Sequence, residues 1–255
     1  MKNKFIYLTL VAIALAPSVF AQFPFGPPPA GPPKQAKAAA PIDLSGYWVS
    51  IVTEDWRFRM IAAPKGDSAG VPLNPEGQKV AEAWNPAKDE ASGDTCKAYG
   101  AVGVMRLPTR LHITWQDDET LKIEADNGTQ TRLLHFRGTP AGSLSRQGYS
   151  AAKWQGAVGG IGYFGDAVDS ARGGSLQVTT TLLTPGYIRR NGVPYSDRTT
   201  VTEYFDVIKE TEADWLVLKT IIDDPKYLYR TMIYSTHFRK QPDASGWNPT
   251  PCYSK

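Results

Sequence analysis

Residues 44–60 read LSGYWVSIVTEDWRFRM, and this stretch decides how the rest of the chain is interpreted. It is apolar and aromatic enough for a buried strand, yet four of its side chains are charged: Glu54, Asp55, Arg57 and Arg59. With the two-residue period of a strand, Glu54 shares a face with Trp56 and Phe58. The other three charges share the opposite, mixed face.

A carboxyl held among aromatic rings has its charged form disfavoured, which raises its pKa toward the range useful for acid–base chemistry. Glu54 is therefore a candidate catalytic residue, and Trp56 and Phe58 are candidate ligand contacts. Two other readings of Glu54 stay open. It could lie in water at the rim of a barrel, or pair with an interior arginine.

The same alternation of apolar and polar residues continues through most of the chain. Residues 110–136 form a predicted three-strand meander, in which Asn127-Gly128 is a strong hairpin signal. Four more β-branched and aromatic runs follow in the C-terminal half, at 175–184, 199–208, 214–222 and 227–240. At least eight strands in antiparallel order predict an all-β fold, an up-and-down barrel whose closure removes exposed edges.

Two segments interrupt the predicted strands. Residues 75–87 carry apolar positions at helical spacing and predict one short helix that stops at Pro86. Residues 146–174 are rich in Gly and Ala and predict a long surface loop, and whether the segment 142–175 acts as a lid stays open. Its G-x-G-x-x-G pattern at 160–165 is not interpreted as a dinucleotide site, because no strand-to-helix context surrounds it.

The N-terminus predicts export. Two lysines precede an apolar run at 5–16, and small residues stand at the −3 and −1 positions before Gln22. This pattern is typical of a signal peptide at 1–21 rather than a membrane span. No cysteine follows the run, so no lipobox is present, and the predicted location is periplasmic or secreted.

The remaining chain divides into a linker and one domain. Residues 22–41 are Pro/Ala-rich and predict a disordered linker, and residues 42–255 predict a single barrel domain. Removal of two lysines with the signal peptide changes the formal charge from +3 to 3 − 2 = +1. A near-neutral chain has no electrostatic footprint for nucleic acid or an anionic membrane, so neither is an expected partner. The oligomeric state stays open.

Cys96 and Cys252 are the two cysteines of the chain. In an oxidising compartment an isolated pair usually forms a disulfide, which here would tie the C-terminal tail to the first half of the domain. The alternative is a pair of free thiols or a catalytic cysteine, for which a position so close to the chain end is unfavourable.

Gly46-Tyr47-Trp48 resembles the G-x-W signature of the first barrel strand in lipocalins. The resemblance implies a barrel closed at its base by Trp48, packed against an arginine of the last strand, for which Arg239 is the candidate. It also implies a terminal disulfide and a small hydrophobic ligand. The chain departs from the family in its greater length and its Gly-rich insert. It is also similar to uncharacterised exported bacterial proteins that begin D-L-[ST]-G-x-W.

Three histidines lie in predicted strands: His112, His135 and His237. None has metal-ligand spacing, so we expect no metal site. If the meander strands pair as neighbours, His112 and His135 could approach each other on a polar barrel interior and act as catalytic groups. The alternative is that each is an ordinary structural histidine.

The segment 185–197 holds further candidates around an Asn191-Gly192 turn. Either it is an exposed hairpin with solvated arginines, or it clamps a ligand at the barrel mouth, with Arg190 binding an anionic group and a tyrosine supplying a proton. Tyr187 is the candidate proton donor. The remaining candidate ligand contacts are Tyr195, Arg106 and Arg110.

These residues favour an exported enzyme that performs cofactor-independent acid–base chemistry of the lyase, isomerase or hydratase type. Its substrate would be a small, partly apolar or aromatic molecule inside the barrel. A serine hydrolase is disfavoured because no G-x-S-x-G elbow is present. Two alternatives are a non-catalytic lipocalin-like carrier and an envelope-associated structural domain.

Overall fold

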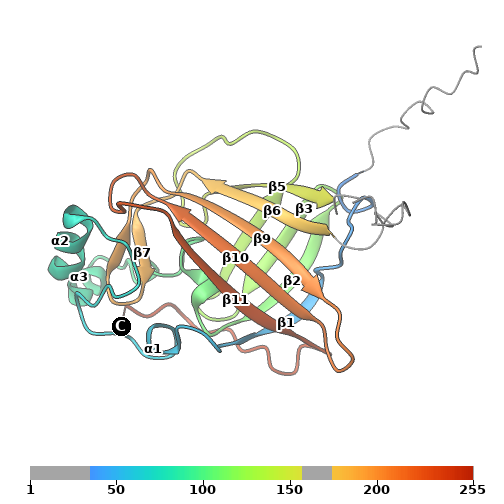
Figure 1. The fold of residues 1–255 in the computed structure, drawn as a ribbon, viewed down its shortest axis with the longest axis horizontal. Coiled ribbons are helices and arrows are strands. Elements are labelled where there is room, and N and C mark those ends of the chain that lie inside the picture. The colour runs from blue at the N-terminus through green and yellow to red at the C-terminus, as the bar shows by residue number, and fades with distance from the viewer. Residues whose placement is uncertain (1–34, 157–173, 255) are drawn as a thin grey trace, which may run out of the picture. The chain divides into compact units, whose positions relative to one another are not determined.

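The computed structural model describes residues 35–156 and 174–254, which belong to one folded unit. In these two ranges, nine strands close into a barrel, which confirms the predicted all-β fold (Figure 1). The order around the barrel is β1, β11, β10, β9, β6, β5, β4, β3 and β2. The strands are β1 (Gly46–Ile51), β2 (Arg110–Asp117), β3 (Thr120–Ala125), β4 (Gln130–His135), β5 (Tyr149–Gly156), β6 (Gly174–Thr181), β9 (Thr200–Ile208), β10 (Trp215–Asp223) and β11 (Met232–Gln241).

Neighbouring strands are antiparallel except for β4 and β5, which pair in parallel through Leu134 and Ser150. The exception follows from the strand number. Directions cannot alternate all the way round a closed ring with an odd number of members, so at least one neighbouring pair must run the same way. A purely up-and-down order is therefore wrong at this one pair.

Strand β5 lies inside the segment predicted as a long loop, so that prediction is wrong for Tyr149–Gly156. The alternation is present, with Ser150 and Ala152 buried in the interior. Alanine has low β propensity, which concealed the pattern. The G-x-G-x-x-G pattern and the rest of the insert, at 157–173, lie outside the described residues, as do the predicted signal peptide and linker residues 22–34.

The opening stretch is not one long strand. β1 ends at Ile51, and Asp55 then adopts a left-handed conformation with φ 53° before the one-turn helix α1 (Trp56–Arg59). A left-handed residue ends the extended backbone, so Glu54 does not share a strand face with aromatic neighbours. This corrects the predicted alternation beyond Ile51.

Large side chains fill one part of the barrel interior around Trp48, Phe205 and Phe238, which are all fully buried. The indole Nε1 of Trp48 donates to the Leu44 carbonyl at 2.9 Å. The ammonium of Lys240 lies 4.5 Å from the centre of the indole ring. The expectation that Arg239 would pack on Trp48 is therefore wrong, because strand alternation turns residue 239 outward and residue 240 inward.

A layer of polar side chains also crosses the barrel interior, next to this apolar part. Arg132 on β4 donates to both carboxylate oxygens of Glu203 on β9, at 3.1 and 2.6 Å, and both residues are buried. The hydroxyl groups of Ser150 and Thr180 are 2.8 Å apart beside this pair. The ion pair links β4 and β9 across the interior, two strands that β5 and β6 separate in the barrel wall.

One end of the barrel is covered by helices and a hairpin (Figure 1). The covering elements are α2 (Pro75–Ala83), α3 (Pro86–Ala91), the 3-10 helix η1 (Val104–Arg106), β7 (Gly186–Arg189) and β8 (Val193–Tyr195). The single predicted helix is thus two helices, because Pro86 begins a new one instead of only ending the first. The predicted Asn191-Gly192 hairpin forms, but it packs into the molecule, with Asn191 buried.

Both ends of the described part of the chain, which starts at residue 35 and finishes at residue 254, are held by specific contacts. Cys96 and Cys252 form the predicted disulfide. At the other end, the indole of Trp154 donates to the Ala36 carbonyl at 2.7 Å, and the Lys37 amide donates to the Asp118 carbonyl at 3.0 Å. Residues 35–41, expected to belong to the linker, therefore pack on the barrel. No helix in the described ranges has the length and apolarity that a membrane crossing requires.

The buried Arg132–Glu203 pair yields a stability prediction. Glu203→Leu leaves the Arg132 charge buried without its partner, which should lower the free energy of unfolding by about 3–5 kcal/mol. The double variant Arg132→Met/Glu203→Leu removes both charges and should recover most of that loss. Urea denaturation of the three proteins measures both effects, and equal stabilities for the single and double variants would contradict the prediction.

The disulfide closes a loop with a sequence separation of 156 residues. On the chain-entropy model, its removal should lower the free energy of unfolding by about 5 kcal/mol. Thermal denaturation of the Cys96→Ser/Cys252→Ser variant, with and without a reductant, measures this. The reductant should destabilise the wild type and leave the variant unchanged. A wild-type melting temperature that is the same with and without the reductant would contradict the prediction.

Candidate functional site

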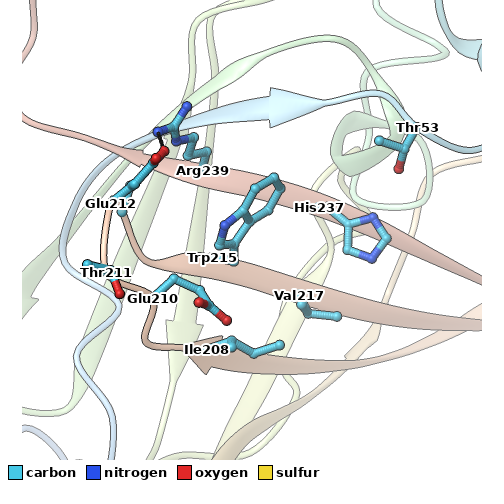
Figure 2. Close-up of a pocket in the computed structure, with 10 residues that line it drawn as sticks. Thr53, Ile208, Glu210, Thr211, Glu212, Trp215, Val217, His237 and Arg239 are labelled. Carbon is cyan, nitrogen blue, oxygen red and sulfur yellow. Dashed lines mark hydrogen bonds and ion pairs between the residues drawn. The ribbon is translucent and has the colours of Figure 1, made fainter.

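The outer faces of β9, β10 and β11 form a groove of about 630 Å³ (Figure 2). The β9–β10 hairpin bounds one end of it, and Thr53 in the segment after β1 reaches it from the other side. The groove is on the outside of the barrel, where period-2 alternation leaves every second side chain of these strands. The groove lining includes Thr53, Ile208, Trp215, Val217, His237 and Arg239.

Strand register brings distant residues side by side on this outer wall, and all of those named next line the groove except Asp206, which lies beside it. Two rows of side chains cross the three strands: Asp206, Val217 and His237 in one, and Ile208, Trp215 and Arg239 in the other. Apolar side chains on β10 therefore lie between polar ones on the neighbouring strands. Figure 2 shows Trp215 and His237 projecting from the same face. Such a surface suits a molecule with an apolar body and a polar group.

Glu54 and His237 form a hydrogen-bond contact at the edge of the groove. Nδ1 of His237 lies 3.2 Å from Oε2 of Glu54, and the Thr53 hydroxyl donates to the same oxygen at 2.7 Å. A carboxylate only accepts hydrogen bonds, so this contact favours the tautomer with the proton on Nδ1. Nε2 is then the unprotonated nitrogen and can act as a base. Both side chains are about one-third exposed, at 31% and 32%.

A buried arginine holds Glu54 in place. The guanidinium of Arg59 pairs with Oε1 of Glu54, donates from Nε to the Arg106 carbonyl at 2.7 Å and donates from Nη2 to the Ser50 hydroxyl at 3.0 Å. Burial lowers the pKa of Arg59, and the neighbouring Glu54 charge opposes that effect. One carboxylate oxygen of Glu54 thus faces the protein and the other faces His237. This is the pairing with an arginine that sequence reasoning left open.

Asp206 supplies a second titratable group in the same row. Burial raises its pKa, and the charge of Lys219 partly offsets this. Asp206 and His237 lie on β9 and β11, with β10 between them, so their backbones are roughly 10 Å apart. A carboxyl that holds its proton more strongly than usual can serve as an acid opposite a basic imidazole.

The other predicted histidines do not meet. His112 stacks on Tyr47, with ring centres 4.2 Å apart, and lies 3.2 Å from the Glu124 carboxylate. His135 stacks on Tyr149, with ring centres 5.0 Å apart. Strand β3 separates β2 from β4, and both imidazoles point outward because their strand neighbours occupy the interior. The expected pair of imidazoles on a polar barrel interior is therefore wrong.

The predicted tyrosines belong to the covering elements. Tyr187 donates its hydroxyl to Asp89 at 2.9 Å, and burial, with that hydrogen bond, raises its pKa above the usual range. Tyr195 is buried, which raises its pKa to about 12. Arg190 lines a hollow of about 10 Å³, which is too small for a substrate. These contacts place none of the three in the groove.

The other predicted ligand contacts are also dispersed. The ring of Trp56 lies outside the groove, and the side chain is 60% exposed on α1. Phe58 lies beneath the Arg189 guanidinium, 4.0 Å from ring centre to Cζ. Arg106 is buried and stacks on the Tyr234 ring at 4.6 Å. Arg110 lies 3.8 Å from Asp126, in a different hollow on β2.

Of the predicted site residues, Glu54 alone contacts a groove-lining side chain through the interactions described above. Sequence reasoning missed His237, Asp206 and Trp215 as site residues. Their strands were predicted, but their proximity depends on the register between β9, β10 and β11, which a single sequence does not specify. The sequence did contain one signal, because strand alternation places all three side chains on the outer face of predicted strands that follow one another in the chain.

Within the described ranges, no three His, Cys, Asp or Glu side chains gather as a metal site would require. No protein-family model matches this chain, and searches of curated proteins and of solved structures found no match. The function is therefore inferred from the geometry of the groove.

The raised pKa of Asp206 predicts a pH-dependent effect on stability. Because the folded state favours the protonated carboxyl, ionisation opposes folding as the pH rises above the ordinary carboxyl pKa of about 4. Asp206→Asn should therefore raise the melting temperature at neutral pH, and this gain should vanish below about pH 4. Thermal denaturation across this range measures the effect. A variant less stable than the wild type at neutral pH would contradict it.

Proposed function

We propose that the protein is an exported enzyme that performs cofactor-independent acid–base chemistry, of the lyase, isomerase or hydratase type, in the outer groove. The observation that carries this proposal is the Glu54–His237 contact at the groove edge, because a carboxylate on Nδ1 prepares Nε2 to accept a proton. The Cys96–Cys252 disulfide is compatible with the oxidising compartment that export implies.

In the proposed reaction, Nε2 of His237 removes a proton from carbon next to an electron-withdrawing group of the substrate. The electron pair moves into that group, and the Glu54 carboxylate stabilises the imidazolium that forms. Asp206, on the far side of Val217, donates a proton to the product or to the departing group. For an isomerisation, the proton on His237 finally returns through solvent to Asp206, so both groups recover their starting states.

The apolar floor defines the substrate class. Ile208, Trp215 and Val217 offer a surface for the apolar or aromatic part of a small molecule. Arg239 pairs at 3.2 Å with Glu212, whose side chain is 87% exposed. Such an exposed pair is worth less than about 1 kcal/mol, so Arg239 is free to bind an anionic group of the substrate instead.

The groove replaces the barrel interior as the proposed site. Fully buried aromatic and aliphatic side chains occupy one part of the barrel interior, and the Arg132–Glu203 layer lies next to them. An internal ligand would have to displace these packed groups, whereas the groove is already open. The chemistry proposed from the sequence is therefore kept, with His237 in place of His112 and His135 as the partner of Glu54.

The alternative is a non-catalytic carrier of a small hydrophobic ligand. The apolar floor of the groove favours binding whether or not chemistry follows, and the lipocalin resemblance at Gly46–Trp48 points the same way. A carrier would use Trp215 and Val217 in the same manner but would have no use for an oriented imidazole. The role of His237 therefore distinguishes the two functions.

The test compares His237→Asn with the wild type. Asparagine can still donate a hydrogen bond to Glu54 but offers no basic nitrogen, so the fold should persist while proton abstraction falls by at least about 100-fold. Deuterium incorporation from D₂O into a panel of small aromatic ketones and carboxylic acids, followed by ¹H NMR, measures abstraction directly.

His112→Asn is the matched control, because His112 also pairs with a glutamate on the barrel exterior but lies on β2, across β1 from the strand of His237, and does not line the groove. Its exchange rate should equal that of the wild type. An unchanged rate for His237→Asn would contradict the proposed mechanism. Binding of panel compounds by the wild type with no exchange in any of them would favour the carrier.

A further inference from the structure

Three buried arginines lie together where α1 meets the barrel: Arg59, Arg106 and Arg189, each at most 5% exposed. Glu54 pairs with Arg59, while Asp55 pairs with Arg106 and lies 3.5 Å from Arg189. Within the described ranges, these are the carboxylates in ion-pair contact with the three guanidinium groups. Three buried positive charges therefore share two negative ones, and buried charge is costly unless it is paired.

Of the three buried arginines, Arg189 is the one with the least complete pairing of its charge. Its Nη1 donates to the Ala69 carbonyl at 2.8 Å, and its guanidinium lies over the Phe58 ring. Its Nε is buried and has no hydrogen-bond partner among the described residues. Burial and the neighbouring Arg106 charge lower the pKa of Arg189 to about 10. This guanidinium has an unused donor and no carboxylate of its own.

Asp55 occupies the space between Arg106 and Arg189 at some conformational cost. It is the residue at φ 53°, in the left-handed region that few residues other than Gly, Asn and Asp adopt. A strained residue in a charge cluster is a recognised sign of a functional position. Its side chain is 32% exposed, so the cluster is reached from solvent at this point.

Charge pairs, more than packing, hold the segment that carries Asp55. Helix α1 is a single turn in which only Arg59 is buried. Trp56 and Met60 remain 60% and 54% exposed, so little apolar contact would be lost if the turn moved outward. The segment can therefore lift when another anion takes the place of its carboxylate.

We propose that Arg106 and Arg189 form a binding site for a small oxyanion, a carboxylate or a phosphate, and that Asp55 fills this site when no ligand is bound. Two guanidinium groups present the planar, paired donors that both kinds of oxyanion accept. The Tyr234 ring, which lies on β11 and outside the segment that moves, stacks on the Arg106 guanidinium and holds its plane in place. The site lies apart from the groove and does not depend on chemistry at His237.

The test removes the internal occupant. Asp55→Asn keeps the size of the side chain and the tolerance for left-handed backbone but deletes the competing charge. It should bind phosphate or acetate at least tenfold more tightly than the wild type. Isothermal titration calorimetry with sodium phosphate and, separately, sodium acetate at matched ionic strength measures this. The salt with the larger gain identifies the ligand class.

Two controls make the result specific. Glu119→Gln deletes a half-buried carboxylate that pairs with Arg137 at 2.9 Å, and it should bind both anions as the wild type does. The double variant Asp55→Asn/Arg189→Met should lose the gained affinity. Equal affinity of Asp55→Asn and wild type for both salts would overturn the proposal, as would a gain that survives the loss of Arg189.

A folding defect in Asp55→Asn would also be decisive. If the variant fails to fold in dilute buffer, phosphate or acetate should restore its soluble yield by filling the vacant site, at concentrations that leave Glu119→Gln unaffected. Failure of both anions to restore it would show that Asp55 is a permanent structural partner of Arg106, and the proposal would be wrong.

Discussion

Closure of the nine-stranded sheet is the constraint on which the rest of the structure depends. Once β1 pairs with both β2 and β11, no strand of the barrel has a free edge, and alternation assigns each side chain to the inside or the outside. The inside is filled by residues such as Trp48 and Phe205. Sites that exchange with solvent must then lie on the outer wall or where the covering elements meet the barrel.

Arg59 connects the buried interior with the outer wall of the barrel. Its guanidinium reaches the inward-facing Ser50 hydroxyl and also fixes Glu54, which in turn contacts His237 on the outer wall. The orientation of an exterior imidazole thus depends on a charge buried beside the core. The neighbouring residue, Asp55, has a left-handed backbone, and its carboxylate contacts two other buried arginines. One short irregular segment therefore serves both the groove and the proposed oxyanion site.

Much of the fold could be predicted from the sequence because it depends on local patterns. Alternation identified the strands that bear Trp215 and His237, and the Asn127-Gly128 and Asn191-Gly192 turns both form. Strand β5 escaped because Ala151 and Ala152 give little contrast between its faces. The parallel β4–β5 pair follows from the total number of strands, which could not be counted while β5 was missing.

The site could not be predicted to the same extent, because it depends on register and on one backbone conformation. The outward position of His237 follows from alternation, but its neighbours on β10 follow from pairings that lie far apart in sequence. Glu54 was selected for sharing a face with Trp56, and the left-handed Asp55 removed that relation. Glu54 is still a candidate site residue for a different physical reason, which is that its carboxylate contacts Arg59 and His237.

In the proposed mechanism, Glu54 orients His237 so that Nε2 is the basic nitrogen in the groove. The most direct measurement is the tautomer of this imidazole, observed by ¹H–¹⁵N NMR of the neutral side chain in the wild-type protein. We expect a proton on Nδ1, with Nε2 unprotonated. A neutral His237 that carries its proton on Nε2 would contradict it, because no base would then face the groove.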